Sequence, residues 1–310
     1  MKNYFISLPE FKKMFPSEES IISLISQRRS GGVARCSYCD SANIILREKM
    51  IYCLKCQKRG SVLVGTIFEH SKISLGTWLY LMLLMSNSSH TLPVSFVARH
   101  LGVTASSAFR MLACIRLHIE ALHRGLVLGC SGEVIQVDET LIGSVKAGKG
   151  GGRSGAIVLG VYSSKGVVAQ HIPNRRRETL FPLIQLHAAP GSWVATDQFR
   201  AYSSLSKLGF RHVSMNHGRR EFVTAEGYST VGIEGYWANL KFSLRSCNIT
   251  PNFENLQPYL SEHAFKFSCR KRGIAPFEAM IADFPAIDFG KWSKRAARDI
   301  ENHFSDGTEF

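Results

Sequence analysis

The sequence predicts a multidomain protein with three parts: a small cysteine-bound ribbon, an all-α region, and a C-terminal α/β domain with a mixed sheet. Three observations support this. Two Cys-x-x-Cys pairs lie close together before residue 60, two short helical patterns meet at a glycine near residue 102, and strand and helix patterns alternate from residue 133 onwards. With 310 residues, the chain is longer than one ordinary domain needs. We expect the segments 1–70, 71–130 and 131–275, followed by a helical tail at 276–310.

Four of the eight cysteines form two identical pairs with 13 residues between them. Two thiolates two residues apart fit one edge of a tetrahedron, and a second such pair completes it. The pattern therefore predicts a structural Zn²⁺ site in a ribbon. Because four protein ligands close the coordination shell, we expect no catalysis there. The predicted ligands are Cys36, Cys39, Cys53 and Cys56.

Charge and hydropathy narrow the class of protein. The chain has 38 Lys or Arg against 24 Asp or Glu, a formal net charge of +14, and is 45% hydrophobic, so it can build a core. Residues 1–130 hold 16 of the basic residues and only 7 of the acidic ones. A basic excess of this size is typical of proteins that bind a polyanion, most often nucleic acid.

No secretory pattern opens the chain, and the longest apolar stretch, 77–85, is about half of a membrane span. We therefore expect a cytoplasmic protein with no membrane partner. In a reducing compartment eight cysteines do not indicate four disulfides. The four cysteines outside the two pairs are expected to be plain buried thiols: Cys114, Cys130, Cys247 and Cys269.

The all-α region carries the pattern of a helix-turn-helix. A helix over 72–86, introduced by Ser71 or Ser74, precedes a short helix, a turn at Gly102, an N-cap at Thr104 and a second helix. The small core would consist of Val97, Leu101, Val103, Phe109 and Leu112. Three polar side chains of the second helix would then be available to a DNA groove: Ser106, Ser107 and Arg110. The alternative is an αα-hairpin that packs on the rest of the protein.

From residue 133 the spacing of the apolar residues changes from a helical to a strand-like pattern. The patterns predict strands at 133–138, 156–163, 166–172, 192–197 and 211–215, with helices at 174–187 and 199–208 and a last one near 232–241. This order matches a ribonuclease H-like arrangement, in which the first and fourth strands lie side by side. Asp138 and Asp197 would then meet at the centre of the sheet, with Glu234 on the helix packed across them.

A pocket of three carboxylates suits hard divalent cations such as Mg²⁺. Lys241 lies two helical turns after Glu234 on the same face, within reach of a phosphate near the metals. Glu139 would point to the opposite face of its strand. Taken singly, each acid has another explanation: Asp138 in a turn, Asp197 as a helix N-cap, and Glu234 near a helix N-terminus. His217 remains open between DNA contact, proton transfer and a core position.

A glycine-rich segment, Gly143 to Gly155, lies in the same domain. The Walker pattern is absent, so a nucleotide-binding loop is not indicated. The segment is either a solvent-exposed loop or a contact to the nucleic-acid backbone, and its DNA-binding candidates are Lys146, Lys149 and Arg153.

Four segments together resemble bacterial insertion-sequence transposases: 137–143, 196–202, 216–217 and 233–241. The resemblance is to the IS-fifteen-ninety-five group, which shares the ISXO-like DDE transposase domain. Those proteins also carry an N-terminal zinc ribbon, matched here by the paired cysteines, and Gly65–Glu69 fits as well. The resemblance covers residues from about 20 to 272, nearly the whole chain.

The resemblance implies a DDE transposase with a catalytic Asp-Asp-Glu triad and a following lysine: Asp138, Asp197, Glu234 and Lys241. It implies Mg²⁺ or Mn²⁺ on the three acids and two-metal phosphoryl transfer. A strand is cut at the element's end, and the freed 3′-hydroxyl attacks target DNA in line. The expected partner is double-stranded DNA, both element ends and target. Synapsis of two ends implies a homodimer or higher oligomer, associated with the nucleoid.

Two other functions stay open. One is a zinc-ribbon and helix-turn-helix regulator derived from an inactive transposase, which binds DNA without Mg²⁺-dependent nicking. The other is a metal-dependent nuclease of the same fold, which cleaves DNA but never joins it.

Overall fold

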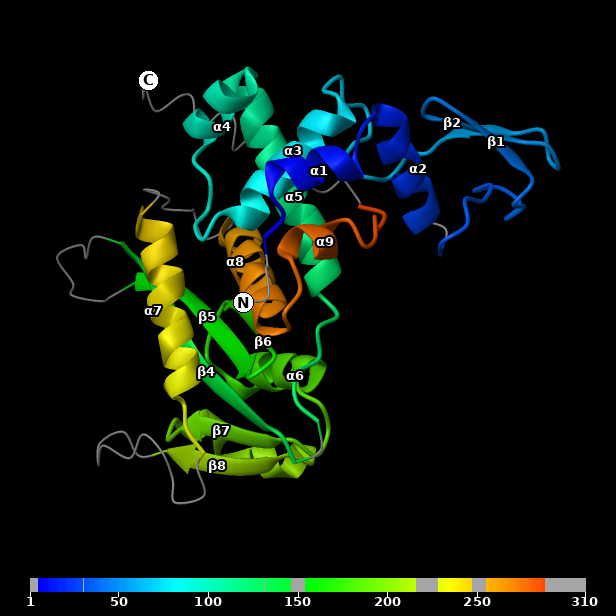
Figure 1. The fold of residues 1–310 in the computed structure, drawn as a ribbon. Coiled ribbons are helices and arrows are strands. Elements are labelled where there is room, and N and C mark those ends of the chain that lie inside the picture. Colours follow the sequence, from blue (N-terminus) through cyan, green and yellow to red (C-terminus); the bar gives the residue numbers. More distant parts are fainter. Residues whose placement is uncertain are drawn as a thin grey trace. The chain divides into compact units, whose positions relative to one another are not determined.

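The computed structural model describes residues 5–29, 31–130, 132–145, 154–215, 228–246 and 255–287. The chain forms two compact units. The first, here called the ribbon unit, comprises Met1–Ser88, Leu92–Leu122 and Ala275–Phe310. The second, the sheet unit, comprises Ser89–Thr91 and His123–Ile274. Figure 1 labels their elements.

The ribbon unit opens with two helices and a small antiparallel sheet of order β1-β2-β3. Ser7 caps the first helix: its hydroxyl accepts a hydrogen bond from the backbone N–H of Glu10, whose carboxylate in turn accepts from the Ser7 backbone N–H. In the ribbon, Ile44 pairs with Cys53, and Tyr52 pairs with Arg59. The elements are α1 Leu8–Met14, α2 Glu18–Arg29, β1 Ile44–Arg47, β2 Met50–Cys53 and β3 Arg59–Ser61.

Three further helices of this unit lie where the sequence predicts them: α3 Leu75–Asn87, α4 Val94–Leu101 and α5 Ala105–His123. Ser74 accepts a hydrogen bond from the Thr77 N–H and so begins α3. Gly102 ends α4 in the left-handed region at φ 65°, a conformation that glycine adopts without a Cβ penalty. Thr104 accepts from the Ser107 N–H and caps α5, as expected.

The small core of these helices differs from the expectation. Val97 and Leu112 are buried, but Leu101, Val103 and Phe109 are only partly buried. The buried positions of α5 instead follow a stripe at helical spacing: Ala108, Met111, Leu112, Ile115 and Ile119.

The segment after residue 274 returns to the ribbon unit and completes its core. α9 (Pro276–Met280) places the Phe277 ring 5.7 Å from the Phe11 ring. The Phe284 ring lies 5.7 Å from that of Phe68, and the imidazole Nε2 of His118 is 2.7 Å from the Met280 carbonyl oxygen. None of the described helices is both long and apolar enough to cross a membrane.

The sheet unit is built on a mixed five-stranded sheet of order β6-β5-β4-β7-β8. β5 runs antiparallel to its two neighbours β4 and β6, whereas β7 and β8 run parallel to β4. The first and fourth strands of the domain are therefore neighbours, as the sequence predicts. The strands are β4 Val134–Val145, β5 Ser154–Ser163, β6 Gly166–Ile172, β7 Trp193–Asp197 and β8 Arg211–Met215.

The first of these strands is longer than expected. The sequence pattern ends it at Asp138, but β4 continues to Val145 and pairs with β5 as far as Ser154. Residues 139–142 stay in the strand because they pair with residues 156–159 of β5. Asp138 consequently lies within the strand, opposite Gly160.

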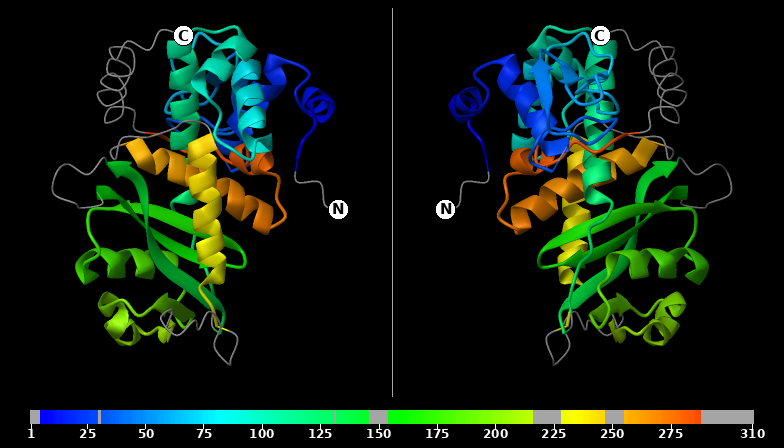
Figure 2. Two further views of the ribbon diagram at one scale, coloured as in Figure 1. Left: turned by 90° about the vertical axis from the view of Figure 1, so that its left-hand side faces the viewer. Right: turned by 90° about the vertical axis from the view of Figure 1, so that its right-hand side faces the viewer.

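Helices cover both faces of this sheet, and each face has its own core. On one face α6 (Arg177–His187) and the 3₁₀ helix η1 (Arg200–Leu208) pack on residues such as Val137 and Val161. On the other face α7 (Val231–Ser246) and α8 (Leu256–Lys271) pack on Val158 and Ala169. Figure 2 shows α7, in yellow, lying along the green sheet.

Candidate active site and metal centre

Three acidic side chains lie where β4, β7 and α7 come together. β4 and β7 pair in parallel, and their last paired residues are Gln136 and Ala195. Asp138 and Asp197, the last residue of β7, each lie two residues beyond this pair, so the register directs both toward the same end of the two strands. Glu234 lies in the first turn of α7, the helix that packs against both β4 and β5.

The carboxylate of Asp138 has a fixed orientation. The indole Nε1–H of Trp237, one helical turn after Glu234, donates to Asp138 Oδ2 over 3.0 Å. The Trp237 ring lies over Gly160: a Cβ built there would be 2.5 Å from Trp237 Cζ2. Burial raises the pKa of Asp138, while the Trp237 N–H lowers it. The sequence pattern does not indicate a role for Trp237 or Gly160, because only the strand register and the packing of α7 bring them to Asp138.

The other two acids are held by neighbours in their own segments. Asp197 Oδ1 accepts from the Phe199 N–H over 2.9 Å, which turns the chain from β7 toward η1. Glu234 Oε1 accepts from the Thr230 hydroxyl over 3.0 Å. Asp197 is partly buried and Glu234 is exposed, so the site opens toward solvent on the α7 side.

The charges of these groups act on one another. Asp197 and Glu234 both add to the rise in the pKa of Asp138. Burial lowers the pKa of Lys241, two turns after Glu234, and the negative charge of Asp138 offsets part of that effect. The four predicted site residues, Asp138, Asp197, Glu234 and Lys241, thus come from three elements. The charges of Asp197, Glu234 and Lys241 each interact with that of Asp138. In the described residues the three acids do not form a group with all ligand atoms within 4.8 Å of one another.

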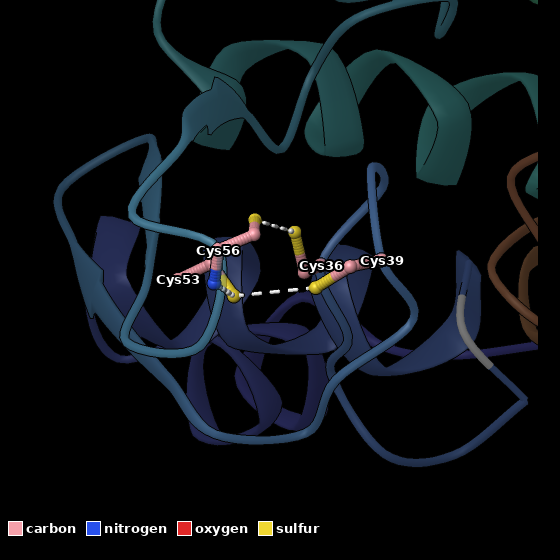
Figure 3. Close-up of side chains that lie close together, drawn as sticks. All are labelled: Cys36, Cys39, Cys53 and Cys56. Atoms are coloured by element: carbon pink, nitrogen blue, oxygen red, sulfur yellow. Dashed lines mark hydrogen bonds between the residues drawn. The ribbon is translucent and has the colours of Figure 1, made fainter.

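Such a group does exist in the ribbon unit. The ligand atoms of Cys36, Cys39, Cys53 and Cys56 all lie within 4.8 Å of one another. Figure 3 shows the four side chains gathered between the two knuckles. Tetrahedral Zn–S bonds of about 2.3 Å require sulfur atoms about 3.8 Å apart. The measured Sγ–Sγ distances are 3.7 Å for Cys36–Cys56 and 3.5 Å for Cys39–Cys53.

The knuckles also favour thiolates. The Tyr38 N–H donates to Cys36 Sγ, and the Cys56 N–H donates to Cys53 Sγ, each over 3.4 Å. The backbone N–H of Cys56 lowers the pKa of Cys53, whereas at Cys39 the pKa-lowering effect of the Ser41 N–H is outweighed by burial and the neighbouring thiols, which raise the pKa. The donor set, its spacing and its geometry therefore fit a structural zinc ion.

Comparison with known proteins places the chain in a family. The model of the ISXO2-like transposase domain matches residues 130–268, which contain all three acids and Lys241. A Haemophilus influenzae protein described as an uncharacterized transposase-like protein is 34% identical over 97 residues, which cover 31% of this chain and 76% of that relative.

The chain belongs to the ISXO2-like transposases. This is the IS-fifteen-ninety-five group that the sequence motifs resemble.

In this transposase Glu139 faces away from Asp138, as expected for the next residue of a strand. Its carboxylate accepts a hydrogen bond from the Tyr202 hydroxyl of η1, on the sheet face opposite α7. Burial raises the pKa of Glu139 to about 7, although the Tyr202 hydrogen bond lowers it. Glu139 therefore joins β4 to η1, while Asp138 faces α7.

The DNA-binding candidates fall into two groups. On α5 of the transposase, Ser106 and Arg110 are exposed, and Ser107 Oγ accepts from the Thr104 hydroxyl over 2.9 Å. The other group, from the glycine-rich segment, lies outside the described residues: Lys146, Lys149 and Arg153. His217 lies outside them as well.

One prediction about the remaining cysteines is wrong. Cys114 and Cys269 are buried as expected, but Cys130 is exposed, and its thiol donates to Glu133 Oε2 over 3.3 Å. Cys130 lies after Leu128, which is the residue that anchors this segment by pairing with Ala188. Cys247 lies outside the described residues.

Proposed function

We propose that this transposase is a DDE enzyme that binds the ends of its insertion sequence, cuts them, and joins them to target DNA by metal-dependent phosphoryl transfer. The observation that carries the proposal is the approach of Asp138, Asp197 and Glu234 from β4, β7 and α7, close enough for the charges of Asp197 and Glu234 to act on Asp138. Like charges gathered at one place in a partly buried site need cations to offset them.

We further propose that the sheet unit has the ribonuclease H-like fold. The strand order β6-β5-β4-β7-β8 supports this, with three antiparallel strands followed by two that run parallel to the first. In that fold the first and fourth strands present acidic residues side by side. The register that directs Asp138 and Asp197 toward the same end of the two strands agrees with this arrangement.

Asp138, Asp197 and Glu234 would hold Mg²⁺ or Mn²⁺, since hard divalent cations prefer carboxylate oxygens. Two cations about 4 Å apart share some ligands and use others singly, so three carboxylates can serve them without forming one tight group. When bound, the cations stabilise negative charge on the attacking and leaving oxygens and lower the pKa of water.

The residues around the triad have separate tasks. Trp237 donates to Oδ2 of Asp138 and so fixes the orientation of the carboxylate that would bind a metal. Lys241, whose ammonium group interacts with the charge of Asp138, would bind a phosphate of the scissile strand. Trp237 is thus a positioning residue, and Lys241 a substrate-binding one.

The reaction balances without an external energy source. In the first step water attacks a phosphodiester at the element's end, and the P–O3′ bond breaks to leave a 3′-hydroxyl and a 5′-phosphate. In the second, that 3′-hydroxyl oxygen attacks a target phosphodiester, and the target's own 3′-oxygen leaves as a hydroxyl. One phosphodiester bond forms as another breaks, so positioning and charge stabilisation supply the catalysis.

DNA recognition is assigned to the ribbon unit. α4 and α5 meet at the Gly102 turn in the manner of a helix-turn-helix, and α5 presents Ser106, Ser107 and Arg110. Because two element ends must be held together for joining, the active form would be a dimer or larger.

The test is Asp138→Asn. We expect loss of Mg²⁺-dependent cleavage and joining by about a thousandfold or more, because the substitution removes a metal ligand. End binding in an electrophoretic shift assay should remain, and the exposed Glu178→Gln on α6 serves as the control with unchanged activity. An Asp138→Asn protein that still cuts at the wild-type rate contradicts the proposal.

The same assay separates the other functions. Sequence-specific binding with no nicking in Mg²⁺ or Mn²⁺ identifies a regulator. Nicked but never joined products identify a nuclease. The three carboxylates favour the transposase over the regulator, since a DNA-binding regulator has no use for a partly buried acidic group.

A further inference from the structure

A cavity of about 590 Å³ lies within the ribbon unit, between the end of α2 and the zinc ribbon. Its walls come from four segments, one of which is β2 through Ile51. Ser26 and Arg29 belong to α2, residues 35–40 form the first cysteine knuckle, and residues 58–62 include β3. The volume falls within the range of roughly 300 to 1,000 Å³ of pockets that hold a small ligand. No task of the proposed mechanism uses this cavity.

Three cations and one acid line the cavity: Arg29, Arg35, Lys58 and Asp40. Arg29 has a structural role, because its Nη1 donates to the Val62 carbonyl oxygen over 2.6 Å. Arg35 Nη1 donates to the Asp40 backbone carbonyl oxygen over 2.9 Å and lies 3.4 Å from the Asp40 carboxylate, but that carboxylate side chain is 84% exposed. Such a solvated pair contributes little free energy, so a phosphate can compete for Arg35.

An aromatic ring accompanies these cations. Tyr38 is 58% exposed, although it lies in the wall of the cavity, and Lys58 Nζ is 4.9 Å from its ring centroid. The ring also lies near Gly60, where an added Cβ would be 3.6 Å from Tyr38 Cε2. An exposed aromatic ring beside two cations is the combination by which proteins bind unpaired nucleotides, since the ring stacks on a base and the cations bind phosphate.

The local charge supports an anionic ligand even with the metal bound. Residues 28–61 hold eight Lys or Arg and two Asp or Glu. One zinc ion with four thiolates carries a charge of −2, which leaves this segment at +4. A paired base has both faces covered by its neighbours in the duplex, so only an unpaired one can stack on Tyr38.

We propose that this cavity binds one unpaired nucleotide of a DNA strand, with its phosphate between Arg35 and Lys58 and its base against Tyr38. The inference rests on the proposed function, because that function makes DNA the substrate. It adds that the ribbon holds a nucleotide released from the duplex near an element end or target site.

The test measures binding of a short fluorescent oligo(dT) to the full-length, zinc-loaded protein by anisotropy. Tyr38→Ala should weaken binding by about 5- to 100-fold, the usual effect of removing one stacked aromatic ring. Tyr38→Phe keeps the ring and should bind as the wild type does. Lys58→Ala should reduce the slope of log affinity against log salt by about 0.7, the value for one phosphate contact on a single strand.

Arg47→Ala is the matched control, since Arg47 is an exposed cation of the same ribbon that does not line the cavity. Zinc content and thermal unfolding confirm that each variant is folded. Four results would overturn the inference: wild-type affinity in zinc-loaded Tyr38→Ala, equal losses for Arg47→Ala and Lys58→Ala, an equal loss on blunt duplex DNA, or tighter binding of oligo(U) than of oligo(dT).

Failure of the inference is distinguishable from failure of the proposed function. The cleavage assay reports on the carboxylates of the sheet unit, whereas the effect of Tyr38→Ala on oligo(dT) binding reports on the ribbon unit. If Asp138→Asn abolishes cleavage while Tyr38→Ala binds normally, the cavity assignment fails and the enzyme assignment stands. If Asp138→Asn still cleaves, the enzyme assignment fails whatever Tyr38 does.

Discussion

The ribbon unit and the sheet unit each gather metal-binding side chains, but they do so differently. The four thiols come from residues 36–56, where two knuckle turns and one hairpin bring all ligand atoms within 4.8 Å of one another. The three carboxylates come from β4, β7 and α7, which fold together only when the whole sheet unit forms. A local turn can prearrange its ligands, whereas a site built from distant elements depends on the packing around it.

The surroundings of the ligands differ accordingly. Backbone N–H groups donate to Cys36 and Cys53 and stabilise the thiolates before metal arrives. At Asp138 burial and two neighbouring acids disfavour the charged form, and the indole N–H of Trp237 and the backbone N–H of Glu139 offset them only in part. We infer that the zinc ion holds the ribbon's fold together, whereas the carboxylate site keeps its fold without metal.

Removal of zinc is the largest test of this difference. A strong chelator should unfold the ribbon, because structural zinc contributes apparent free energies of about 10–16 kcal/mol in zinc-finger peptides. Hydrogen exchange followed by mass spectrometry should then show lost protection at residues 44–61 and retained protection in β4 to β8. Cys53→Ser should behave like the chelated protein, and Cys130→Ser, at an exposed thiol outside the cluster, like the wild type.

Continued protection of the amides of residues 44–61 after chelation would show that the ribbon folds without zinc, contrary to this expectation. An equal loss of protection in the strands of the sheet unit would also contradict the expectation, because the fold around the carboxylates would then depend on bound metal.

The thiol cluster and the carboxylate site also differ in how far the sequence alone predicts them. The thiol cluster follows from spacing alone, since Cys-x-x-Cys fits a tetrahedron wherever it occurs. The strands that carry Asp138 and Asp197 were predicted from apolar runs and are confirmed as neighbours. Their assignment as catalytic came from the resemblance, because each acid alone also fits a cap or a turn.

Other features could not be predicted because they depend on tertiary contacts. The continuation of β4 beyond Asp138 depends on pairing with β5, which its mixed polar pattern does not indicate. The hydrogen bond from Trp237 to Asp138 depends on Gly160, which is close to neither residue in sequence. The exposure of Cys130 depends on where the preceding residues are anchored.

Acid should destabilise the sheet unit through a buried histidine. His123 lies 3.0 Å from the Val167 carbonyl oxygen, and burial lowers its pKa to about 4. The unfolded chain binds a proton near pH 6.5, so between pH 6.5 and 4 it holds more protons than the folded chain. The contribution of His123 is therefore complete above pH 6.5 and falls with pH, by on the order of 3 kcal/mol at pH 4.

Chemical denaturation of the full chain at several pH values checks this. His123→Gln should flatten the loss of unfolding free energy of the sheet unit between pH 6.5 and 4, and the exposed His70→Gln serves as control. An identical pH slope in His123→Gln and wild type would contradict the assignment.

The smallest effect concerns two glycines beside the carboxylate site. Gly160→Ala adds a Cβ 2.5 Å from Trp237 Cζ2 and 2.9 Å from Ile233 Cδ1, both in a packed core. Such overpacking costs about 1–3 kcal/mol of stability. The displaced indole would also release Asp138, so cleavage should fall further than stability alone explains. A Trp237→Phe protein keeps most of the packing but loses the N–H donor, and should lose activity with a smaller loss of stability.

Gly235→Ala is the matched control, because it makes the same chemical change next to Glu234. Among the described residues, no atom outside the adjoining turns of α7 lies within 4 Å of the added Cβ, and an alanine inside helix α7 should stabilise the protein by about 0.5–1 kcal/mol. Unfolding curves and cleavage rates of both variants, measured side by side, separate positioning from general stability. If Gly160→Ala cleaves as well as Gly235→Ala, then Trp237 does not set the orientation of Asp138, and packing on the α7 face does not position the carboxylate site.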